Sequence, residues 1–464
     1  MDPTNLITDS SVVCGVVAMP YPARGHINPM MNLCKQLVLK SPSILVTFVV
    51  TEEWLGIIGE QTKPANICFV TIPNVIPSER VRGKDFPGFL EAISTKMEAP
   101  FEELLDRLKH PVSAIVADTY LVWAVEVGNR RNIPVASLMT MSATVFSVLH
   151  HLELLVQNGH FPVELSDVTD HGDEHLDQIP GISSKHLEDL RTVFHDNDPR
   201  GMEMLFESIS NVPKAKHLVI NSVYELEAQA FDTLKAVLPF PVYPVGPVIP
   251  YLDLEDASFK NGEPDYLKWL DAQPQDSVLY ISLGSFYAVS STQMDEFAIA
   301  LRNSGVRFLW VAREEASRLK DSCGDKGFVV PWCEQLKVLC HPSVGGFWSH
   351  CGWNSTQEAV YGGVPMLAFP LFLDQVPNWR QIVEDWKSGW SVKRAEVGSE
   401  ILVAKEDISE LVQKFMDLES SEGNEVRKRA RELKSICRQS IAQSRSSSAN
   451  LDAFICDFLP GHGQ

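Results

Sequence analysis

The segment from Trp332 to Gln375 constrains the fold of this chain more than any other stretch of its sequence. An apolar run at 343–348 is followed by the residues His-Cys-Gly-Trp-Asn-Ser at 350–355, and then by residues that favour a helix. A strand, a turn of glycine and small polar residues, and a helix in this order are typical of a parallel α/β sheet. The first N–H groups of such a helix lack partners inside it, so they can bind an anion such as phosphate.

Side chains around this turn match the parts of a nucleotide. Trp332 offers an indole that can stack on a flat base, and Glu358 offers a carboxylate that can accept hydrogen bonds from ribose hydroxyls. His350 and Ser355 flank the turn and can donate to phosphate oxygens, while Gly352 lets the backbone approach a ligand closely. The turn therefore predicts a nucleotide site with its phosphates at the helix N-terminus.

A second polar pair follows the next predicted strand, which spans 365–370. Asp374 and Gln375 supply an acceptor and a donor of the kind that bind sugar hydroxyls. With this pair, the base, the ribose, the diphosphate and the sugar of a nucleotide sugar each have a predicted partner. The sequence therefore predicts a nucleotide-sugar site in this half of the chain.

The remainder of the chain alternates short apolar runs with helical patterns. The predicted strands lie at 11–19, 44–50, 67–72, 113–117, 135–138 and 217–221 in the first half, and at 277–283, 308–311 and 328–330 in the second. Strands that alternate with helices predict parallel sheets covered by helices on both faces. The first helix is expected to begin at Asn28-Pro29, where proline is tolerated in the first turn, and to run through Leu39.

The middle of the chain suggests where two domains meet. Residues 239–251 are rich in proline, which is typical of an extended interdomain linker. Residues 160–199 are acidic and poor in periodicity, and are expected to form a surface excursion. The expected division is a first domain at 1–245, a linker at 246–264, a second domain at 265–440, and a C-terminal segment at 441–464 in which a polar break at 444–449 precedes an amphipathic helix at 451–459.

Charge and cysteine content exclude several classes of protein. The 464 residues carry a formal net charge of −20, whereas binding to nucleic acid or to an anionic membrane needs a basic surface. The 9 cysteines are scattered, which is typical of a reducing compartment rather than a disulfide framework. No stretch approaches the ~20 apolar residues of a membrane span, and residues 1–10 lack the basic residues of a targeting peptide. The expected location is the cytoplasm, and neither nucleic acid nor a membrane is an expected partner.

The segment from Trp332 to Gln375 resembles the signature box of the plant secondary-product UDP-glycosyltransferases, the inverting family 1 enzymes. The His-Cys-Gly-Trp-Asn-Ser core is intact at 350–355, and the glutamate and the final Asp-Gln pair of the box are present. The box departs at its start, where Trp332 is followed by Cys-Glu-Gln instead of Ala-Pro-Gln, and Ser349 replaces a threonine. The resemblance implies a GT-B-type α/β fold: two facing Rossmann-like domains with parallel sheets, a cleft between them, and a C-terminal helix that crosses back to the first domain.

The same resemblance implies that a UDP-sugar binds to the second domain and the acceptor to the first. The donor-binding residues that it implies are Trp332, Cys333, Gln335, His350, Trp353, Asn354, Ser355, Glu358, Asp374 and Gln375. It adds Ser285, in a Gly-Ser pair after a strand, for the diphosphate, and Thr140 for the donor sugar. Gln375 is similar to the residue of family members that use UDP-glucose, so glucose is the expected sugar.

Two residues of the first half predict a catalytic pair. His26 lies just before a predicted helix, whose positive end should keep the imidazole neutral and able to accept a proton. Asp118 ends a predicted strand, at the edge where ligands bind in open α/β sheets. A neutral histidine held by a carboxylate is a base with its orienting partner. The alternative is a surface-loop histidine without a catalytic role, because spacing alone does not show that the two side chains meet.

The resemblance favours the catalytic interpretation. Family members share a Pro-x-x-Gly-His-x-x-Pro loop, present here at 22–29, and an aspartate at a strand end, present here in Val116-Ala117-Asp118. It implies that His26 removes the proton of the acceptor hydroxyl, and that the acceptor oxygen attacks the anomeric carbon from the face opposite UDP, without a metal. The expected acceptor is a small lipophilic molecule such as a flavonoid or another plant phenolic, and the expected protein is a monomer.

Three alternatives compete with this interpretation. Cys340-His341 and His350-Cys351 have the residue types of a zinc site, but they lack the close cysteine pairs that such sites usually show. A Rossmann-type dehydrogenase needs a Gly-x-Gly-x-x-Gly turn after its first strand, and this chain has none there. A catalytically silent nucleotide-sugar-binding protein would be expected to lack His26 or Asp118, and both are present.

Overall fold

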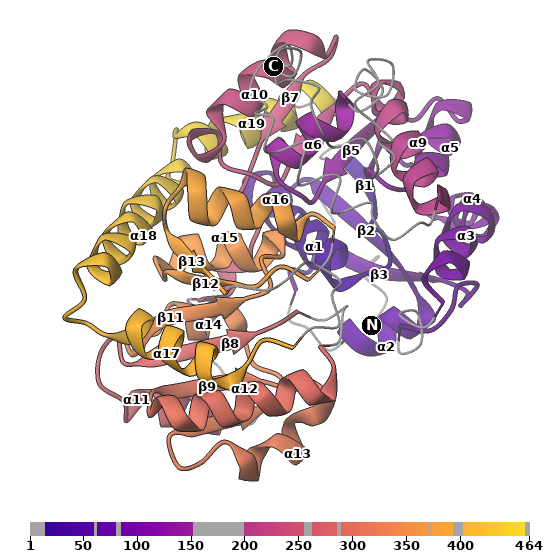
Figure 1. Ribbon diagram of the computed structural model, residues 1–464. Helices are drawn as coiled ribbons and strands as arrows, with labels where there is room; N and C mark the ends of the chain where they lie inside the picture. The colour runs from indigo at the N-terminus through magenta and orange to yellow at the C-terminus, as the bar shows by residue number, and fades with distance from the viewer. Residues whose placement is uncertain are drawn as a thin grey trace, which may run out of the picture.

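The computed structural model describes residues 14–59, 63–79, 85–151, 199–254, 262–284, 289–371, 373–392 and 402–459. This part of the chain forms two parallel sheets with helices packed around each (Figure 1). The first sheet has the strand order β3-β2-β1-β4-β5-β6-β7, and the second has the order β10-β9-β8-β11-β12-β13. The predicted fold class of two parallel-sheet α/β domains is therefore confirmed.

The first sheet is covered by helices on both faces. Its strands are β1 (Cys14–Met19), β2 (Ile44–Thr51), β3 (Ile67–Ile72), β4 (Ala114–Asp118), β5 (Val135–Met139), β6 (Leu218–Ile220) and β7 (Val242–Pro244). Along β1, Val16 and Ala18 join one hydrophobic core and Val17 joins the other, because successive side chains of a strand point to opposite faces. The helices of this half are α1 (Arg24–Lys40), α2 (Glu52–Ile58), α3 (Phe86–Lys96), α4 (Glu98–Arg107), α5 (Val122–Arg130), α6 (Ala143–His150), α9 (Pro199–Ala215) and α10 (Ala228–Val237).

The second sheet repeats this plan. Its strands are β8 (Val278–Ser282), β9 (Arg307–Val311), β10 (Gly327–Val330), β11 (Val344–Ser349), β12 (Met366–Ala368) and β13 (Gly389–Ser391). Tyr280 of β8 belongs to one core, and its neighbours Leu279 and Ile281 belong to the other. The helices of this half are α11 (Asp265–Asp271), α12 (Ser291–Ser304), α13 (Ala316–Leu319), α14 (Gln335–Leu339), α15 (Trp353–Gly362), α16 (Gln375–Arg380), α17 (Lys405–Met416) and α18 (Ser421–Ser440). The chain leaves the first sheet at β7 and enters the second at β8, so the division at residue 245 and the linker at 246–264 stay predictions.

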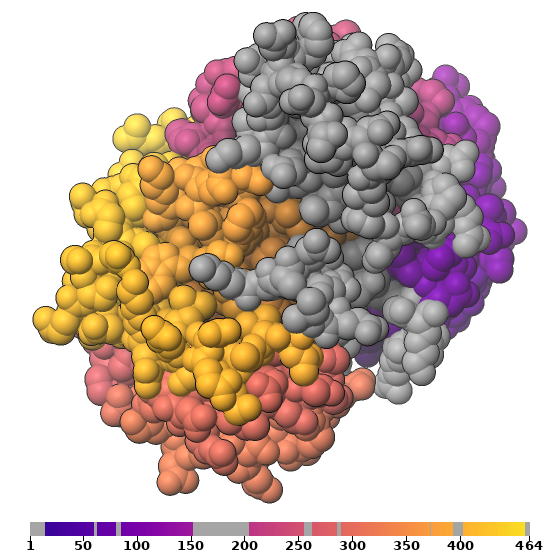
Figure 2. All heavy atoms as spheres, viewed as in Figure 1, coloured from indigo at the N-terminus to yellow at the C-terminus, as the bar shows by residue number. Residues whose placement is uncertain are grey.

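The last helix, α19 (Ser446–Phe458), returns to the first sheet, as predicted. Leu451 and Phe454 of α19 share a hydrophobic core with β1 and β2, and the phenol of Tyr243 in β7 donates to Asp457 at 2.8 Å. Figure 1 shows α19 beside β7 and α10, and in Figure 2 the yellow C-terminal residues lie along the left edge of the molecule. The helix begins at Ser446, inside the predicted polar break at 444–449. Ser447 and Ser448 in its first turn are buried, so this polar stretch packs against the protein.

The predicted start of the first helix was wrong. Helix α1 begins at Arg24, so Pro29 is its sixth residue rather than part of a new first turn. Proline has no N–H, so Pro29 cannot give the hydrogen bond that residue 29 of a regular helix would give to the carbonyl of Gly25. The helix therefore continues through Pro29, and the carbonyl of Gly25 receives no hydrogen bond from residue 29.

Two predictions made for longer stretches have different outcomes. The excursion predicted at 160–199 falls almost wholly outside the described residues. Among the helices of the described ranges, none combines the length and the apolar character that crossing a bilayer would require.

Candidate active site

His26, Asp118 and Thr140 meet at the carboxyl edge of the first sheet. His26 is the third residue of α1, which follows β1, and Asp118 is the last residue of β4. Thr140 follows β5, the strand next to β4. Parallel strands end at the same sheet edge, so three side chains that are far apart in the sequence come to one place.

The imidazole of His26 is fixed through its Nδ1 atom. This atom lies 2.8 Å from Oδ2 of Asp118 and 2.9 Å from Oγ1 of Thr140. The carboxylate of Asp118 is buried, and its other oxygen accepts from the backbone N–H of Tyr120 at 3.1 Å. An ionised carboxylate can only accept, so Nδ1 carries the proton and Nε2 carries the lone pair. The two side chains predicted to form the catalytic pair therefore meet, in the geometry of a base and its orienting carboxylate.

Aromatic rings enclose His26. The centroid of its ring lies 4.9 Å from that of Tyr21 and 5.7 Å from that of Tyr120, and both tyrosines are buried. Burial foremost, and then the nearby carboxylates of Asp118 and Asp374, hold the pKa of Tyr120 well above its usual range. Because Asp374 comes from the second half of the chain, this cluster marks a place where the two halves meet.

The predicted strand–turn–helix unit is formed by β11, the turn at 350–352 and α15. Cys351 adopts a φ of 66°, and Gly352 caps the N-terminus of α15. The imidazole of His350 packs between Gly284 and Gly352, since a Cβ added to these glycines would lie 2.7 Å and 2.4 Å, respectively, from its Nε2. Both positions therefore require glycine. Burial lowers the pKa of His350 to about 4, against a hydrogen bond with the backbone of Ser282, which raises it, so the ring is neutral.

A relay of hydrogen bonds holds the residues predicted to contact the ribose. The buried phenol of Tyr280 donates to Oε1 of Gln335 at 3.1 Å. The Nε2 of Gln335 then donates to Oγ of Ser355 at 2.9 Å and to Oε2 of Glu358 at 2.6 Å. Burial raises the pKa of Glu358 to about 7, although the hydrogen bond from Gln335 acts in the opposite direction. The carboxyl of Glu358 is therefore close to half ionised at neutral pH.

The start of the box differs from the family pattern in a way that the structure accommodates. Trp332 is 61% exposed, so the indole is accessible to a base, whereas Cys333 is buried with its Sγ 3.4 Å from the phenol oxygen of Tyr280. The backbone N–H of Glu334 donates to the phenol oxygen of Tyr266 in α11 at 3.2 Å. Proline, which usually stands at this position in the family, has no N–H and could not make that bond. The departure from the pattern therefore gains a hydrogen bond that fixes the segment before α14.

Asp374 and Gln375 stand at the start of α16, where the second half approaches His26. Asn378 donates to Oδ2 of Asp374 at 2.9 Å, and Oε1 of Gln375 accepts from the backbone N–H of Leu371 at 2.8 Å. Burial raises the pKa of Asp374 to about 6, against the hydrogen bond from Asn378 and the electrostatic influence of the nearby His26, which both lower it. The influence of His26 shows that the carboxylate predicted to bind the sugar lies near the predicted base.

The box also contacts the first half directly. The indole N–H of Trp353 donates to the backbone carbonyl of Asn221 at 2.6 Å, and Nδ2 of Asn354 donates to the carbonyl of Gly25 at 2.8 Å. Trp353 is buried, so its ring packs between the halves. The remaining predicted donor residue, Ser285, lies outside the described residues.

The residues of the zinc alternative do not form a cluster. No group of three or more histidine, cysteine or acidic side chains in the described ranges could hold a metal ion. His341 instead contacts Ser343 and Asp271, at 2.8 Å and 3.1 Å. Cys340 lies 3.8 Å from the guanidinium of Arg438. These contacts argue against a zinc site at Cys340-His341, and metal independence of the reaction stays a prediction.

Comparison with known proteins identifies the class to which this site belongs. A family model described as UDP-glucoronosyl and UDP-glucosyl transferase matches residues 217–419. UDP-glycosyltransferase 87A2 of Arabidopsis thaliana is 52% identical over 442 residues, which cover 95% of this chain and 96% of the relative. The 7-deoxyloganetin glucosyltransferase of Catharanthus roseus is 32% identical, with 95% of both chains covered.

A solved structure gives the same result. The UGT2 protein of Phytolacca americana, complexed with UDP-2fluoro-glucose and pterostilbene, is 26% identical with a TM-score of 0.78, over 96% of this chain and 99% of that one. Fold and sequence together define a GT-B-type glycosyltransferase. The chain belongs to the UDP-glycosyltransferase family, and it is an enzyme that transfers sugar from a UDP-sugar to small-molecule acceptors.

Several residues of the site were not found from the sequence. Asn221, Tyr280 and Tyr266 hold predicted site residues through hydrogen bonds. Asn221 directly follows a strand, and a polar residue at the carboxyl end of a parallel strand is a signal that could have indicated it. The two tyrosines gave no such signal, because buried tyrosines are common in cores and their partners are distant in sequence.

Proposed function

We propose that this enzyme transfers glucose from UDP-glucose to a hydroxyl group of a small lipophilic acceptor, such as a flavonoid or another plant phenolic, with inversion at the anomeric carbon. His26 acts as the general base, and Asp118 orients it. The observation that carries this proposal is the 2.8 Å contact between Nδ1 of His26 and Oδ2 of Asp118, at the edge of the first sheet that approaches Asp374.

The chemistry follows from the tautomer. Since the Nδ1–H group donates a hydrogen bond to Asp118 and keeps its proton, Nε2 can accept the proton of an acceptor hydroxyl as the hydroxyl oxygen attacks the anomeric carbon. The new bond forms between that oxygen and the anomeric carbon while the bond from carbon to the β-phosphate oxygen breaks. Asp118 stabilises the imidazolium that results, and UDP leaves with the electron pair of the broken bond.

Residues of the second half are proposed to hold the donor. The N–H groups at the start of α15, with His350 and Ser355, face the diphosphate, and their hydrogen bonds strengthen as negative charge develops on the leaving UDP. The indole of Trp332 stacks on uracil, and Glu358 accepts from the ribose hydroxyls. Asp374 and Gln375 bind the sugar hydroxyls.

Two observations support the finer statements. The relative from Catharanthus roseus is named a glucosyltransferase, and the Phytolacca protein was complexed with a fluorinated UDP-glucose and a stilbene, which favours glucose and a lipophilic acceptor. Around His26 the buried rings of Tyr21 and Tyr120 form an apolar, aromatic environment suited to such an acceptor. Aromatic acceptors are therefore the first to test.

The test is turnover of UDP-glucose with flavonols, simple phenols and terpenoid alcohols, beside the same assay of His26→Ala. We expect glucoside with β-configuration from the unmutated enzyme, and a fall of ~10³-fold or more in His26→Ala with UDP affinity nearly unchanged. A comparable loss of UDP affinity in the variant would contradict the base assignment. Transfer of another sugar in preference to glucose would contradict the donor assignment.

A further inference from the structure

We propose that Asn221 is a positioning residue for sugar transfer, and that it acts through Asn354 to hold the donor-binding helix at a fixed distance from His26. This inference rests on the proposed function, since it takes His26 as the base and α15 as the donor-binding helix. The sequence predicted no role for Asn221, and it predicted no contact between Asn354 and the first half of the chain.

Asn221 is fully buried and uses all its polar atoms. Its backbone N–H donates to the carbonyl at the end of β5 at 2.9 Å, and its carbonyl accepts from Trp353 at 2.6 Å and from the amide of Gln357 at 2.9 Å. Its side-chain oxygen accepts from the backbone N–H of Val248 at 2.8 Å, and its side-chain NH₂ donates to Oδ1 of Asn354 at 3.3 Å. One residue therefore joins the first sheet, the segment between the sheets and helix α15.

The two side-chain amides form a chain with a single direction. The chain begins at the backbone N–H of Val248, which can only donate, and it ends at the carbonyl of Gly25, which can only accept. Asn221 must therefore turn its oxygen to Val248 and its NH₂ to Asn354. Asn354 must in turn direct its oxygen to Asn221 and its NH₂ to Gly25, at 2.8 Å.

Pro29 explains why the carbonyl of Gly25 is available to a partner from the other half. In a regular helix this carbonyl would accept from the N–H of the residue four positions later. That residue is Pro29, which has no N–H and so leaves the carbonyl of Gly25 without a donor from the helix. Asn354 fills the vacant position, and Gly25 directly precedes His26.

The functional consequence follows from where the chain of amides ends. Asn354 is the second residue of α15, whose N-terminus is proposed to hold the diphosphate, and the acceptor carbonyl adjoins the proposed base. The hydrogen bonds from Asn221 to Asn354 and from Asn354 to Gly25, here called the bridge, therefore connect the donor-binding helix to the backbone that carries His26. Attack requires the reacting atoms to be placed to within about an ångström, so loss of the bridge should slow the chemical step rather than weaken donor binding.

Asn221→Asp is the most direct test, because it keeps the size and the backbone of the residue. The new carboxylate can still accept from Val248, but it presents an acceptor to Oδ1 of Asn354. The amide of Asn354 must then rotate, which turns its own oxygen towards the carbonyl of Gly25 and breaks that bond. We expect kcat to fall ~10-fold while the Kd of UDP, measured by calorimetry, changes by less than ~3-fold.

Pro29→Ala tests the same bond from the other side. Alanine restores the N–H, and the carbonyl of Gly25 can turn back into the helix, so kcat should fall although the helix itself becomes more regular. If both variants act on the Gly25 bond, their effects on kcat are not additive in the double variant. The matched control is Asn66→Asp, which makes the same chemical change where an amide donates to the carbonyls of Pro42 and Ile44, away from the site.

The outcomes separate this inference from the proposed function. Turnover by the unmutated enzyme that His26→Ala abolishes, together with wild-type kcat in Asn221→Asp, overturns the bridge and leaves the proposed function intact. A fall in kcat matched by an equal loss of UDP affinity, or additive effects in the double variant, also overturns it. A fall in kcat at constant UDP affinity in both single variants, absent from Asn66→Asp, supports it.

Discussion

Glu102 in α4 and Glu358 in α15 are the same residue type on two helices, yet their carboxyl groups are held in opposite ways. Glu102 lies between two guanidinium groups, 3.1 Å from Arg131 and 3.0 Å from Arg130. Arg131 first, and then Arg130, hold the pKa of Glu102 below its usual range. Glu358 is held by the neutral amide of Gln335 at 2.6 Å, and burial raises its pKa to about 7.

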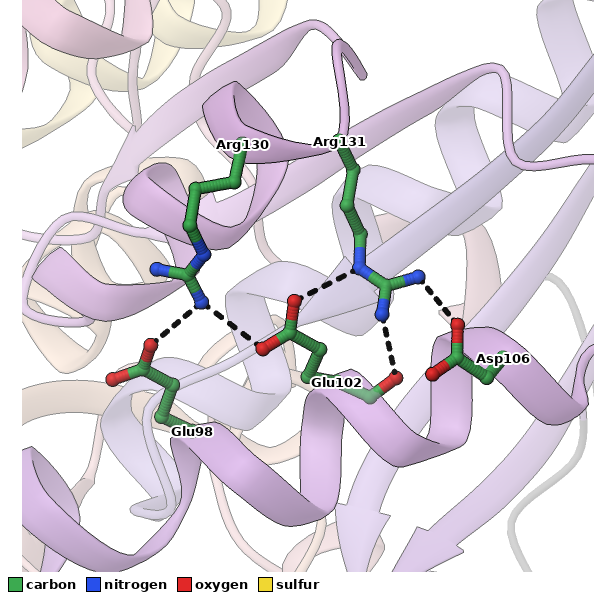
Figure 3. A network of polar contacts seen from close by, with 5 residues as sticks. All are labelled: Glu98, Glu102, Asp106, Arg130 and Arg131. Carbon is green, nitrogen blue, oxygen red and sulfur yellow. Dashed lines mark hydrogen bonds and ion pairs between the residues drawn. The ribbon is translucent and has the colours of Figure 1, made fainter.

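The surroundings of the two groups account for this difference. Figure 3 shows three acidic side chains in a row on α4, which two arginines at the end of α5 bridge: Glu98, Glu102, Asp106, Arg130 and Arg131. These ion pairs face solvent, where water and salt weaken them. Glu358 lies in the interior, where an amide orients the carboxylate without neutralising it. A carboxylate held in this way remains able to bind ligand hydroxyls, whereas one held by cations joins two helices.

Between carboxylates of the site and carboxylates of the surface network, the largest difference in activity is expected for Asp118, which contacts His26. Asp118→Asn should lower turnover by ~10²–10⁴-fold, because the amide can donate to Nδ1 and so stabilise the tautomer whose Nε2 cannot accept a proton. The measurement is kcat with UDP-glucose and an active acceptor. Asp106→Asn, in the surface network, is the matched control and should leave kcat unchanged; similar losses in both variants would remove the distinction between the two regions.

Glu358→Gln should weaken donor binding, with a smaller effect. An amide has only one acceptor oxygen. If that oxygen accepts from Gln335, the NH₂ group faces the ribose hydroxyls, and if it turns to the ribose, the NH₂ group faces the NH₂ of Gln335. Either orientation loses a hydrogen bond, so we expect ~10- to 100-fold lower affinity for UDP. Calorimetric titration of UDP measures this change. Glu102→Gln is the surface counterpart, and a loss of UDP affinity in that variant would show that the effect does not depend on ribose recognition.

The affinity for UDP-glucose should depend on pH through Glu358. The ionised form of Glu358 is the better acceptor, so affinity for UDP-glucose should fall by up to ~10-fold from about pH 8 to about pH 6, as the carboxyl with a pKa of about 7 becomes protonated. UDP-glucose is the ligand to use because its phosphates are diesters that do not titrate in this range. A flat profile in the unmutated enzyme, or a fall in affinity that persists in Glu358→Gln, would contradict the assignment.

In the ligand-free protein, a rise in pH should change the contributions of Glu358 and Glu102 to stability in opposite directions. Because the pKa of Glu358 is raised above its ordinary value of 4.5, its contribution is present in full below that value and is lost as the pH rises through about 7. Glu358→Gln should therefore raise the unfolding midpoint more at pH ~8 than at pH ~6. The lowered pKa of Glu102 makes its contribution present at neutral pH and lost on acidification, so Glu102→Gln should not stabilise the protein at the higher pH.

The smallest effect is expected at the surface network itself. Arg131→Ala removes the contacts with Glu102 and Asp106, and should lower the unfolding midpoint slightly at low salt while leaving kcat and UDP affinity unchanged. The difference from the unmutated protein should disappear near ~1 M salt, because the contacts are exposed. A large loss of stability that salt does not reduce would mean that α4 and α5 are joined by burial of the arginine stem instead.

Much of the site could be predicted because its signals are local. The strand–turn–helix order around 350–355, and the placement of His26 and Asp118 after strands, identify the residues that gather at the carboxyl edges of the two sheets. The start of α1 was missed because proline in a sequence resembles a first-turn residue, while its tolerance deeper in the helix depends on a partner from the other half. Tyr280 and Asn221 were missed because their roles come from contacts more than 50 positions away.

The sequence by itself determined the fold class, the order of the elements and the chemical groups of the site, because hydrophobic period and turn residues act over a few neighbouring positions. Only the tertiary structure decided which of these groups meet and how they are charged. The pair of His26 and Asp118, the amide chain from Val248 to Gly25, and the raised pKa of Glu358 all depend on packing between segments distant in the chain. Burial and hydrogen-bond direction are properties of that packing, and no stretch of sequence contains them.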